Sequence, residues 1–243
     1  MDVNIRNKRA VLLTGTIIPN SIYTQHTDAL TRLSEYLFAI GFYCRLFKND
    51  DVYFLENSDF NLEADASYQE LKAEYSFTLL KFPRSEKFNE GKGYQEFEMM
   101  DGAVDLLKEK HTSFIKITGR YIIKNAAVLT GFECRGIVID LNRRQRLAQT
   151  YFIYFTTQFY LDHLKGAYKN VNDNEGLFIE KVIYDKITVP AVLKSCSLFA
   201  KTPFLSGSTG SYGIVMKRNY LRVKIRNVER FFYNLLNIKS FFY

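Results

Sequence analysis

A cation inside an apolar run is the first sign of chemistry in this sequence. Residues 114–121 read Phe-Ile-Lys-Ile-Thr-Gly-Arg-Tyr, so Lys116 has apolar neighbours and Arg120 follows it closely. Burying an ammonium without a partner is costly. Lys116 is explained either by a buried structural ion pair or by a diphosphate that Lys116 and Arg120 neutralise together. Arginine suits phosphate because its planar guanidinium holds two oxygens at once. Thr118 and Gly119 are predicted as further contacts of that diphosphate.

A second candidate phosphate contact is Gly-Lys-Gly-Tyr at residues 91–94, just before a predicted helix. The amides at the start of a helix attract anions, and Lys92 adds a positive charge. Lys92 and Gly93 are therefore predicted to face the phosphates of a donor. The segment lacks the P-loop spacing and the Ser or Thr that follows a P-loop lysine. A solvent-exposed hinge explains the same residues equally well.

Two polar clusters follow apolar runs near the start of the chain, namely Ala10–Leu13 and Val52–Leu55. A glycine at the end of a strand lets the backbone approach a ligand closely, although a plain turn uses the same residue types. Both clusters are candidates for contact with a ligand at the strand ends. Their residues are Thr14, Gly15, Thr16, Glu56, Asn57 and Ser58.

Two carboxylates are candidates for work on an acceptor. Glu180 lies near the start of a predicted helix over Phe178–Ile187, where it could take a proton from an acceptor hydroxyl. The alternative is a favourable charge in the first turn of that helix. Asp140 lies towards the end of a predicted strand, Gly136–Leu141, and is a further candidate contact of the donor or acceptor.

No Asp-x-Asp sequence occurs in the chain. Phosphates that bind through Mg²⁺ usually need one or two carboxylates on the metal. A fixed pair of cations, Lys116 and Arg120, could instead stabilise the leaving diphosphate. We therefore expect neither a metal nor another cofactor.

The elements that must position these residues alternate along the chain. Strands are predicted at Ala10–Leu13, Val52–Leu55, Phe77–Leu80, Phe114–Ile117 and Gly136–Leu141, and amphipathic helices over 26–46, 95–110 and 178–187. This alternation predicts an α/β fold with a doubly wound, mostly parallel sheet and helices on both faces. Such sheets bind ligands at the carboxyl ends of their strands. The polar clusters that follow the strands are therefore expected to converge on one cleft.

Composition fits an ordinary globular chain, with 243 residues, 47% hydrophobic and 24% charged. Three widely spaced cysteines give no disulfide framework and no zinc spacing, which indicates a reducing compartment. No signal peptide and no apolar run long enough to span a bilayer is evident. We expect a cytoplasmic protein.

Four segments together resemble small bacterial glycosyltransferases from capsule and lipopolysaccharide gene clusters. They are Leu-Leu-Thr-Gly-Thr-Ile (12–17), Glu-Asn-Ser (56–58), Gly-Lys-Gly-Tyr-Gln-Glu (91–96) and Lys-Ile-Thr-Gly-Arg-Tyr (116–121). The resemblance implies a GT-A-like fold over residues 1–215 that transfers a sugar from a nucleotide-diphosphate donor to a hydroxyl of a lipid-linked oligosaccharide. It also implies that Thr14–Thr16 and Glu56–Ser58 contact the nucleoside of the donor. A sugar nucleotidyltransferase and a non-catalytic membrane- or nucleic-acid-binding module are the alternatives.

The end of the chain differs from the rest in charge. Residues 217–243 contain seven Lys or Arg and one Glu among many aromatic residues, a net charge of +6, whereas residues 1–216 carry +1. We treat 216–243 as a basic amphipathic segment that could lie on an anionic membrane, on the inner face of the cytoplasmic membrane. A helix docked on the domain is the alternative. Nucleic acid is not expected as a partner, because phosphate contacts need cations spread over a face. Residues 205–213 are predicted to be a flexible polar loop between the two parts.

Overall fold

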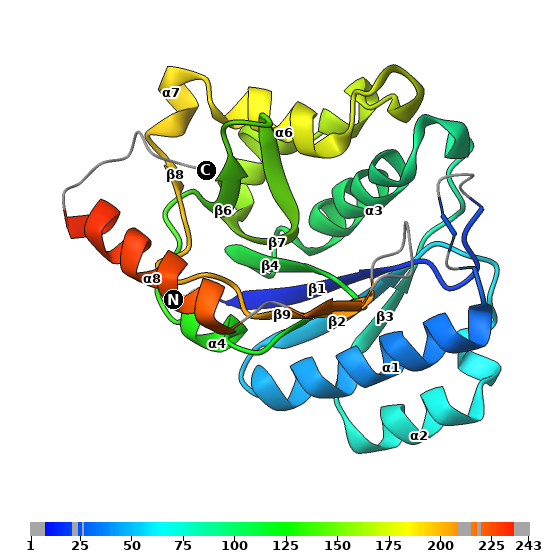
Figure 1. Cartoon of the computed structure of the whole chain (residues 1–243). Coiled ribbons are helices and arrows are strands. Elements are labelled where there is room, and N and C mark those ends of the chain that lie inside the picture. The colour runs from blue at the N-terminus through cyan, green and yellow to red at the C-terminus, as the bar shows by residue number, and fades with distance from the viewer. Residues whose placement is uncertain (1–7, 21–23, 26, 209–214, 218–219, 236–243) are drawn as a thin grey trace, which may run out of the picture.

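A mostly parallel sheet forms the centre of the molecule, as the computed structural model shows for residues 8–20, 24–25, 27–208, 215–217 and 220–235 (Figure 1). Its strands lie in the order β3-β2-β1-β4-β7-β6-β8. β7 pairs antiparallel with both of its neighbours, and the other pairs are parallel. The strands of this sheet are β1 (Arg9–Gly15), β2 (Asp51–Glu56), β3 (Thr78–Lys81), β4 (Ser113–Thr118), β6 (Ile137–Asn142), β7 (Leu147–Thr156) and β8 (Cys196–Ser197).

A second, three-stranded antiparallel sheet has the order β10-β9-β5, with β5 (Ile122–Ile123), β9 (Leu205–Ser208) and β10 (Val215–Lys217). The α-helices are α1 (Ala29–Leu46), α2 (Ala66–Glu74), α3 (Lys92–Leu107), α4 (Ala126–Leu129), α5 (Thr157–Phe159), α6 (Ile179–Ile187), α7 (Pro190–Leu193) and α8 (Tyr220–Leu235). Short 3₁₀ segments lie at Leu62–Ala64, Phe88–Glu90, Ala167–Asn170 and Asp173–Glu175, and a π-helical turn at Tyr160–Leu164.

Alternate residues of each central strand enter two separate cores. On β1, Ala10 and Leu12 pack with α3 and α6, whereas Val11 and Leu13 pack with α1. Figure 1 shows α3 and α6 above the sheet and α1 and α2 below it. A strand that is apolar on both faces is typical of a parallel sheet covered on both sides. The predicted α/β class with a doubly wound, mostly parallel sheet is confirmed.

The predicted strands and helices are present with shifts of a few residues at their ends. On α1, Tyr36 and Tyr43 are buried, whereas Leu30 and Phe38 are exposed. β7 was not predicted. The predicted loop 205–213 is wrong for Leu205–Ser208, which form β9 and pair with β5 and β10. The rest of that loop lies outside the described residues.

Candidate functional site

A cavity of about 700 Å³ lies at the carboxyl ends of β1 and β4. The loops after these strands, Thr14–Thr16 and Thr118–Tyr121, line it together with the first turns of α3 and α6. Its volume is in the range of pockets that bind small molecules, roughly 300–1,000 Å³. The sequence-based expectation of a cleft at this edge of the sheet agrees with this position.

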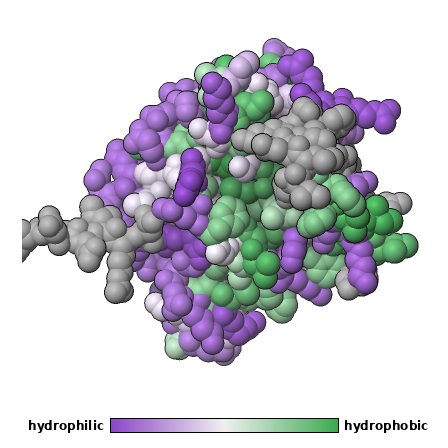
Figure 2. Space-filling model, turned by 90° about the vertical axis from the view of Figure 1, so that its left-hand side faces the viewer, coloured by the Kyte–Doolittle hydropathy of each residue, from purple (hydrophilic) through white to green (hydrophobic). Residues whose placement is uncertain are grey.

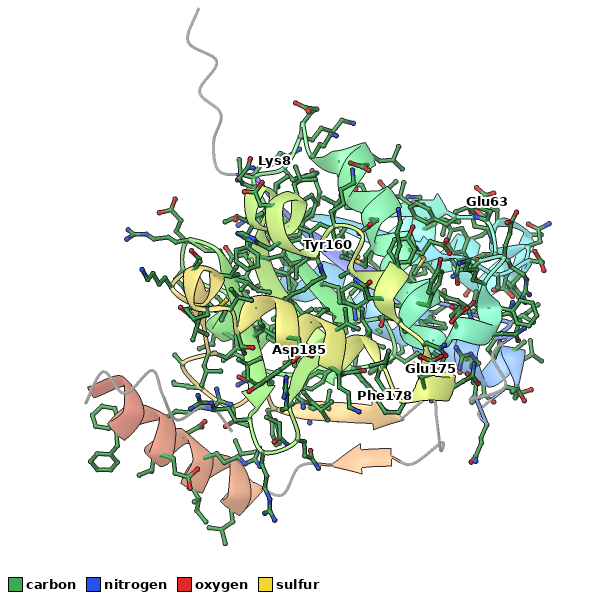
Figure 3. All side chains as sticks on the ribbon, turned by 90° about the horizontal axis from the view of Figure 1, so that it is seen from above. Lys8, Glu63, Tyr160, Glu175, Phe178 and Asp185 are labelled. Atoms are coloured by element: carbon green, nitrogen blue, oxygen red, sulfur yellow. The ribbon has the colours of Figure 1, made fainter. Side chains whose placement is uncertain are left out.

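Charged side chains of both signs line the cavity. The basic ones are Arg32, Lys92 and Arg120, and the acidic ones are Glu96, Asp173 and Glu180. They come from α1, α3, the β4–β5 loop, the 3₁₀ turn before α6, and α6 itself. In Figure 3, Glu175 and Phe178 lie near the beginning of α6, at the end of the helix that faces the cavity.

Lys116 lies beneath the cavity and is fully buried. Its Nζ lies 2.6 Å from Glu96 Oε1 and donates to Thr118 Oγ1 at 3.0 Å and to the Thr150 carbonyl at 2.8 Å. An ammonium has three N–H donors, and these three partners use them. The structure thus shows the buried ion pair and not the diphosphate contact, which corrects the role predicted for Lys116.

Glu96 is one of two acidic cavity residues that sequence reasoning missed, the other being Asp173. Its Oε1 accepts hydrogen bonds from the hydroxyls of Thr14 and Thr118, in addition to the ion pair with Lys116. The side chain remains 22% exposed, towards the cavity. The signal that could have identified it is its place at the end of the segment Gly-Lys-Gly-Tyr-Gln-Glu (91–96), in the first turns of α3.

Glu180 lies in the first turn of α6, as predicted, and lines the cavity. Burial raises the pKa of its carboxyl, and the nearby charge of Glu96 adds to that effect. The backbone N–H of Glu180 and the Thr150 hydroxyl, at 3.1 Å, oppose the rise in pKa by donating hydrogen bonds. A carboxylate with a raised pKa in a cavity is suited to accept a proton near neutral pH.

Arg120 lines the cavity with its guanidinium packed against α1. Its Nη1 donates to Glu35 Oε2 at 3.2 Å, and its Cζ lies 5.8 Å from the centre of the Tyr36 ring. Arg32 holds the loop that follows β1, because its Nε donates to the carbonyl oxygens of Thr16 and Ile17 at 2.9 and 3.2 Å. Arg120 is therefore a predicted cation that reaches the cavity, and Arg32 is one that sequence reasoning missed.

The carboxylate of Asp173 lies at the start of α3. Gly91 has φ +123°, a backbone conformation that favours glycine, and a Cβ built there would lie 2.2 Å from the Asp173 carboxylate. The Asp173 carboxylate accepts a hydrogen bond from the Lys92 amide. Burial lowers the pKa of the Lys92 ammonium, while Asp173 and Glu180 raise it. Lys92 and Gly93 line the cavity as predicted, but at the amide of Lys92 a carboxylate takes the place predicted for phosphate.

The cluster after β2 has a different role from the predicted one. Glu56 is fully buried, and it accepts from the Ile17 amide at 3.2 Å and from Lys81 Nζ at 2.6 Å. Asn57 Oδ1 accepts from the Thr16 hydroxyl at 2.6 Å. Glu56 and Asn57 thus hold the loop after β1 in place, and the Ser58 amide donates to Glu56 at 2.9 Å. All three residues are buried and do not line the cavity.

Two glycines at the strand ends are explained by packing. A Cβ at Gly15 would lie 2.6 Å from the Phe54 ring, and a Cβ at Gly119 would lie 2.7 Å from the Thr14 carbonyl oxygen. The Gly119 amide also donates to that carbonyl at 2.8 Å. The loops after β1 and β4 are thus joined directly, which fixes the two sides of the cavity floor.

Asp140 does not reach the cavity. Its two carboxylate oxygens accept from Nη1 and Nη2 of Arg230 on α8, at 2.9 and 2.8 Å, in a buried bidentate pair. Arg230 Nη1 also donates to the Phe199 carbonyl at 2.6 Å. A role for Asp140 in binding donor or acceptor is therefore replaced by a structural one, which attaches α8 to β6.

Within the described residues, no cluster of three or more His, Cys, Asp or Glu side chains is arranged to hold a metal ion. Metal independence stays a prediction from the missing Asp-x-Asp sequence. The helices that the structure describes include none with the length and apolar character to cross a bilayer. Cys44, Cys134 and Cys196 are free and buried.

No protein-family model and no curated protein matches the sequence of this chain. Among solved structures, the chain is similar to one from Desulfovibrio desulfuricans G20 assigned to the nucleotide-diphospho-sugar transferases, with 10% identity, a TM-score of 0.47, and coverage of 79% of this chain and 80% of the other. It is also similar to a glycosyltransferase involved in glycosylation of the major capsid of PBCV-1, with 9% identity, a TM-score of 0.48, and coverage of 79% and 81%.

A third similar structure is the 4-diphosphocytidyl-2C-methyl-D-erythritol synthase of Anaerococcus prevotii DSM 20548, with 7% identity, a TM-score of 0.45, and coverage of 92% of this chain and 96% of the other. The resemblance of the sequence to capsule and lipopolysaccharide glycosyltransferases stays a prediction.

Proposed function

We propose that this chain is a glycosyltransferase that moves a sugar from a nucleotide-diphosphate donor to a hydroxyl of a surface-glycan intermediate. The observation that carries the proposal is the placement of Arg120 and Lys92 in one cavity with Glu180. A donor with a diphosphate needs cations near the leaving group, and an acceptor hydroxyl needs a base. The cavity supplies both at the edge of the sheet where α/β folds bind nucleotides.

Arg120 is the cation proposed to stabilise the leaving diphosphate. Its guanidinium is anchored on one side by Glu35 and Tyr36, which limits its motion and directs it. Anchored charges stabilise developing negative charge without first having to reorganise. Lys92 adds a second positive charge from the start of α3, and the loop Thr14–Thr16 is proposed to contact the nucleoside.

Glu180 is proposed to act on the acceptor, and Glu96 is proposed to bind the donor sugar. Glu180, with its raised pKa, takes the proton of the acceptor hydroxyl. Glu96 is held by Lys116 and two threonine hydroxyls through one oxygen, so its carboxylate has a fixed orientation on the cavity wall. A fixed carboxylate is suited to accept hydrogen bonds from hydroxyls of the donor sugar.

The first test is a thermal-shift screen with UDP, GDP, CMP, CDP, ADP and TDP, each with and without EDTA. A nucleotide at about 100 times its Kd stabilises a native protein by about 2.7 kcal/mol. For a chain of this size that is a rise of roughly 5–10 °C in melting temperature. A shift that survives EDTA supports a site without a metal, and a shift that needs Mg²⁺ or Mn²⁺ overturns that part.

Arg120→Ala should abolish the shift, and Arg146→Ala is its matched control. Arg146 is 70% exposed and pairs with Asp185 on the surface, so its loss should leave nucleotide binding unchanged. Transfer is then measured with the sugar donor of the identified base. Release of pyrophosphate from a nucleoside triphosphate and a sugar phosphate would instead identify a sugar nucleotidyltransferase, and no shift with any nucleotide would contradict both activities.

A further inference from the structure

One side of α8 is fixed to the domain. Val223 is buried, the Asn227 side chain accepts from the Thr202 amide at 2.7 Å, and Arg230 forms the buried pair with Asp140. These positions are four and three residues apart, so they form one face of the helix. The opposite face is therefore held outward in a defined orientation.

The outward face of α8 is apolar. Five large hydrophobic residues within residues 221–232 are between 51% and 64% exposed, namely Leu221, Ile225, Val228, Phe231 and Phe232. Four of them follow a spacing of four, three and four residues, which forms a single stripe along the helix. Figure 2 looks at the side of the molecule on which α8 lies, and it shows hydrophobic surface across the middle and right of this view.

Cations accompany the stripe. Lys224 and Arg226 are exposed on the same helix, and residues 217–243 as a whole carry a net charge of +6. We propose that α8 docks on an anionic lipid surface, with the apolar stripe in the acyl boundary and the cations at the headgroups. A helix with an apolar face and basic flanks binds in this way, and each cation near an anionic leaflet strengthens the attachment.

The positive charge of this segment favours anionic lipid over a second copy of the chain as the partner of α8. Two copies that met through α8 would bring two basic segments together, and like charges oppose such an interface. Anionic lipid has the complementary charge. Because Arg230 and Asp140 hold the inner face, the stripe can meet a surface without α8 leaving the domain. Docking on the domain and contact with a membrane, the two alternatives from the sequence, are therefore compatible.

The test uses the full chain and sedimentation with two kinds of vesicle, one of phosphatidylcholine and one of phosphatidylcholine mixed with phosphatidylglycerol. The variant Ile225→Gln with Phe232→Gln keeps the net charge and removes two apolar contacts. The matched control is Leu30→Gln with Phe38→Gln on α1, where the residues are 70% and 63% exposed. All of these side chains are on the surface, so equal melting temperatures confirm that each variant is folded.

We expect wild type and control to sediment with the anionic vesicles and much less with the neutral ones. The α8 variant should lose about tenfold or more in partitioning, because burying an Ile or Phe side chain is strongly favourable. High salt should weaken binding of the wild type. Equal binding by the α8 variant, or no preference for anionic vesicles, would overturn the proposal. So would light scattering that shows a dimer which the α8 variant dissociates.

Discussion

The two ends of the central sheet both carry charged residues and a hollow, but they use their charges differently. At the amino end, near a hollow of about 530 Å³, Arg9 and Asp50 form a bidentate pair with distances of 2.9 and 2.6 Å. At the carboxyl end, the Glu96 carboxylate is shared by Lys116 and two hydroxyls, and burial together with its charge raises the pKa of the nearby Glu180 carboxyl. Arg9 and Asp50 thus satisfy each other at the amino end, whereas the carboxyl end concentrates several charges around a cavity.

This difference indicates which end binds a ligand. A matched pair has its hydrogen bonds satisfied within the protein, so it stabilises the fold and offers little to a ligand. Acidic groups with raised pKa values beside a cavity are typical of functional sites. We therefore expect substitutions at the amino end to change stability alone, and substitutions at the carboxyl end to change activity, or activity and stability in opposite directions.

The strongest test of this contrast is Glu180→Gln, which should reduce transfer by about 100- to 10,000-fold through loss of the base. The same change should raise the melting temperature at neutral pH. Burial raises the pKa of Glu180 in the folded state above 4.5, so the folded protein favours the neutral form. The stabilisation from that neutral form is complete below about pH 4.5 and is lost as pH rises through the folded pKa. Glutamine is neutral at every pH, so the Glu180→Gln variant keeps this stabilisation throughout.

Melting curves from acid to neutral pH check the sign, since the two proteins should converge at low pH. Transfer by wild type should rise with pH as Glu180 ionises. Glu175→Gln, in the exposed turn before α6, is the matched control and should change neither property. A less stable Glu180→Gln at neutral pH would contradict the contrast between the two ends.

Lys116→Met should lower the free energy of unfolding by about 3–5 kcal/mol, because it leaves the Glu96 carboxylate without its buried partner. Denaturant titration measures the change. Adding Glu96→Gln to Lys116→Met should recover part of the loss, since no unpaired charge remains. If the single substitution were neutral for stability, Lys116 would not be the support of the cavity floor.

At the amino end, Asp50→Ala should lower the free energy of unfolding by about 1–3 kcal/mol, because Arg9 loses a charged hydrogen-bond partner in a half-buried place. The nucleotide-induced shift in melting temperature should stay the same as in wild type. A loss of nucleotide binding in Asp50→Ala would show that the two ends are coupled.

The smallest effect is expected at the surface pair of Lys165 and Asp105, where the nearest N–O distance is 2.6 Å. Both side chains are about two-fifths exposed, so Lys165→Ala should change the free energy of unfolding by less than about 1 kcal/mol. Denaturant titration at low and high salt measures it, and the difference from wild type should shrink at high salt. A larger loss of unfolding free energy would show that this surface pair contributes as much as the buried pairs do.

Local sequence patterns predicted the features that depend on neighbours in the chain. Apolar runs predicted the strands that carry Thr14 and Thr118, and the edge rule for parallel sheets predicted that their loops meet. Two features depend on tertiary pairing and left no such pattern. β7 runs antiparallel to its neighbours and brings the Thr150 carbonyl to Lys116, so a third N–H of the ammonium is satisfied within the protein. Glu56 lies at the end of a strand, where site residues often occur, but its side chain is buried and accepts hydrogen bonds from the Ile17 amide and Lys81 Nζ.

The pair between Asp140 and Arg230 joins residues that are 90 positions apart in the chain. Because synthesis proceeds from the amino end, Asp140 leaves the ribosome long before the cation that neutralises it. Until then, the seam beside β6 contains a carboxylate that lacks its partner, and burying it is unfavourable. The seam beside β6 can therefore close favourably only after α8 has been synthesised, because burial of Asp140 depends on the arrival of Arg230.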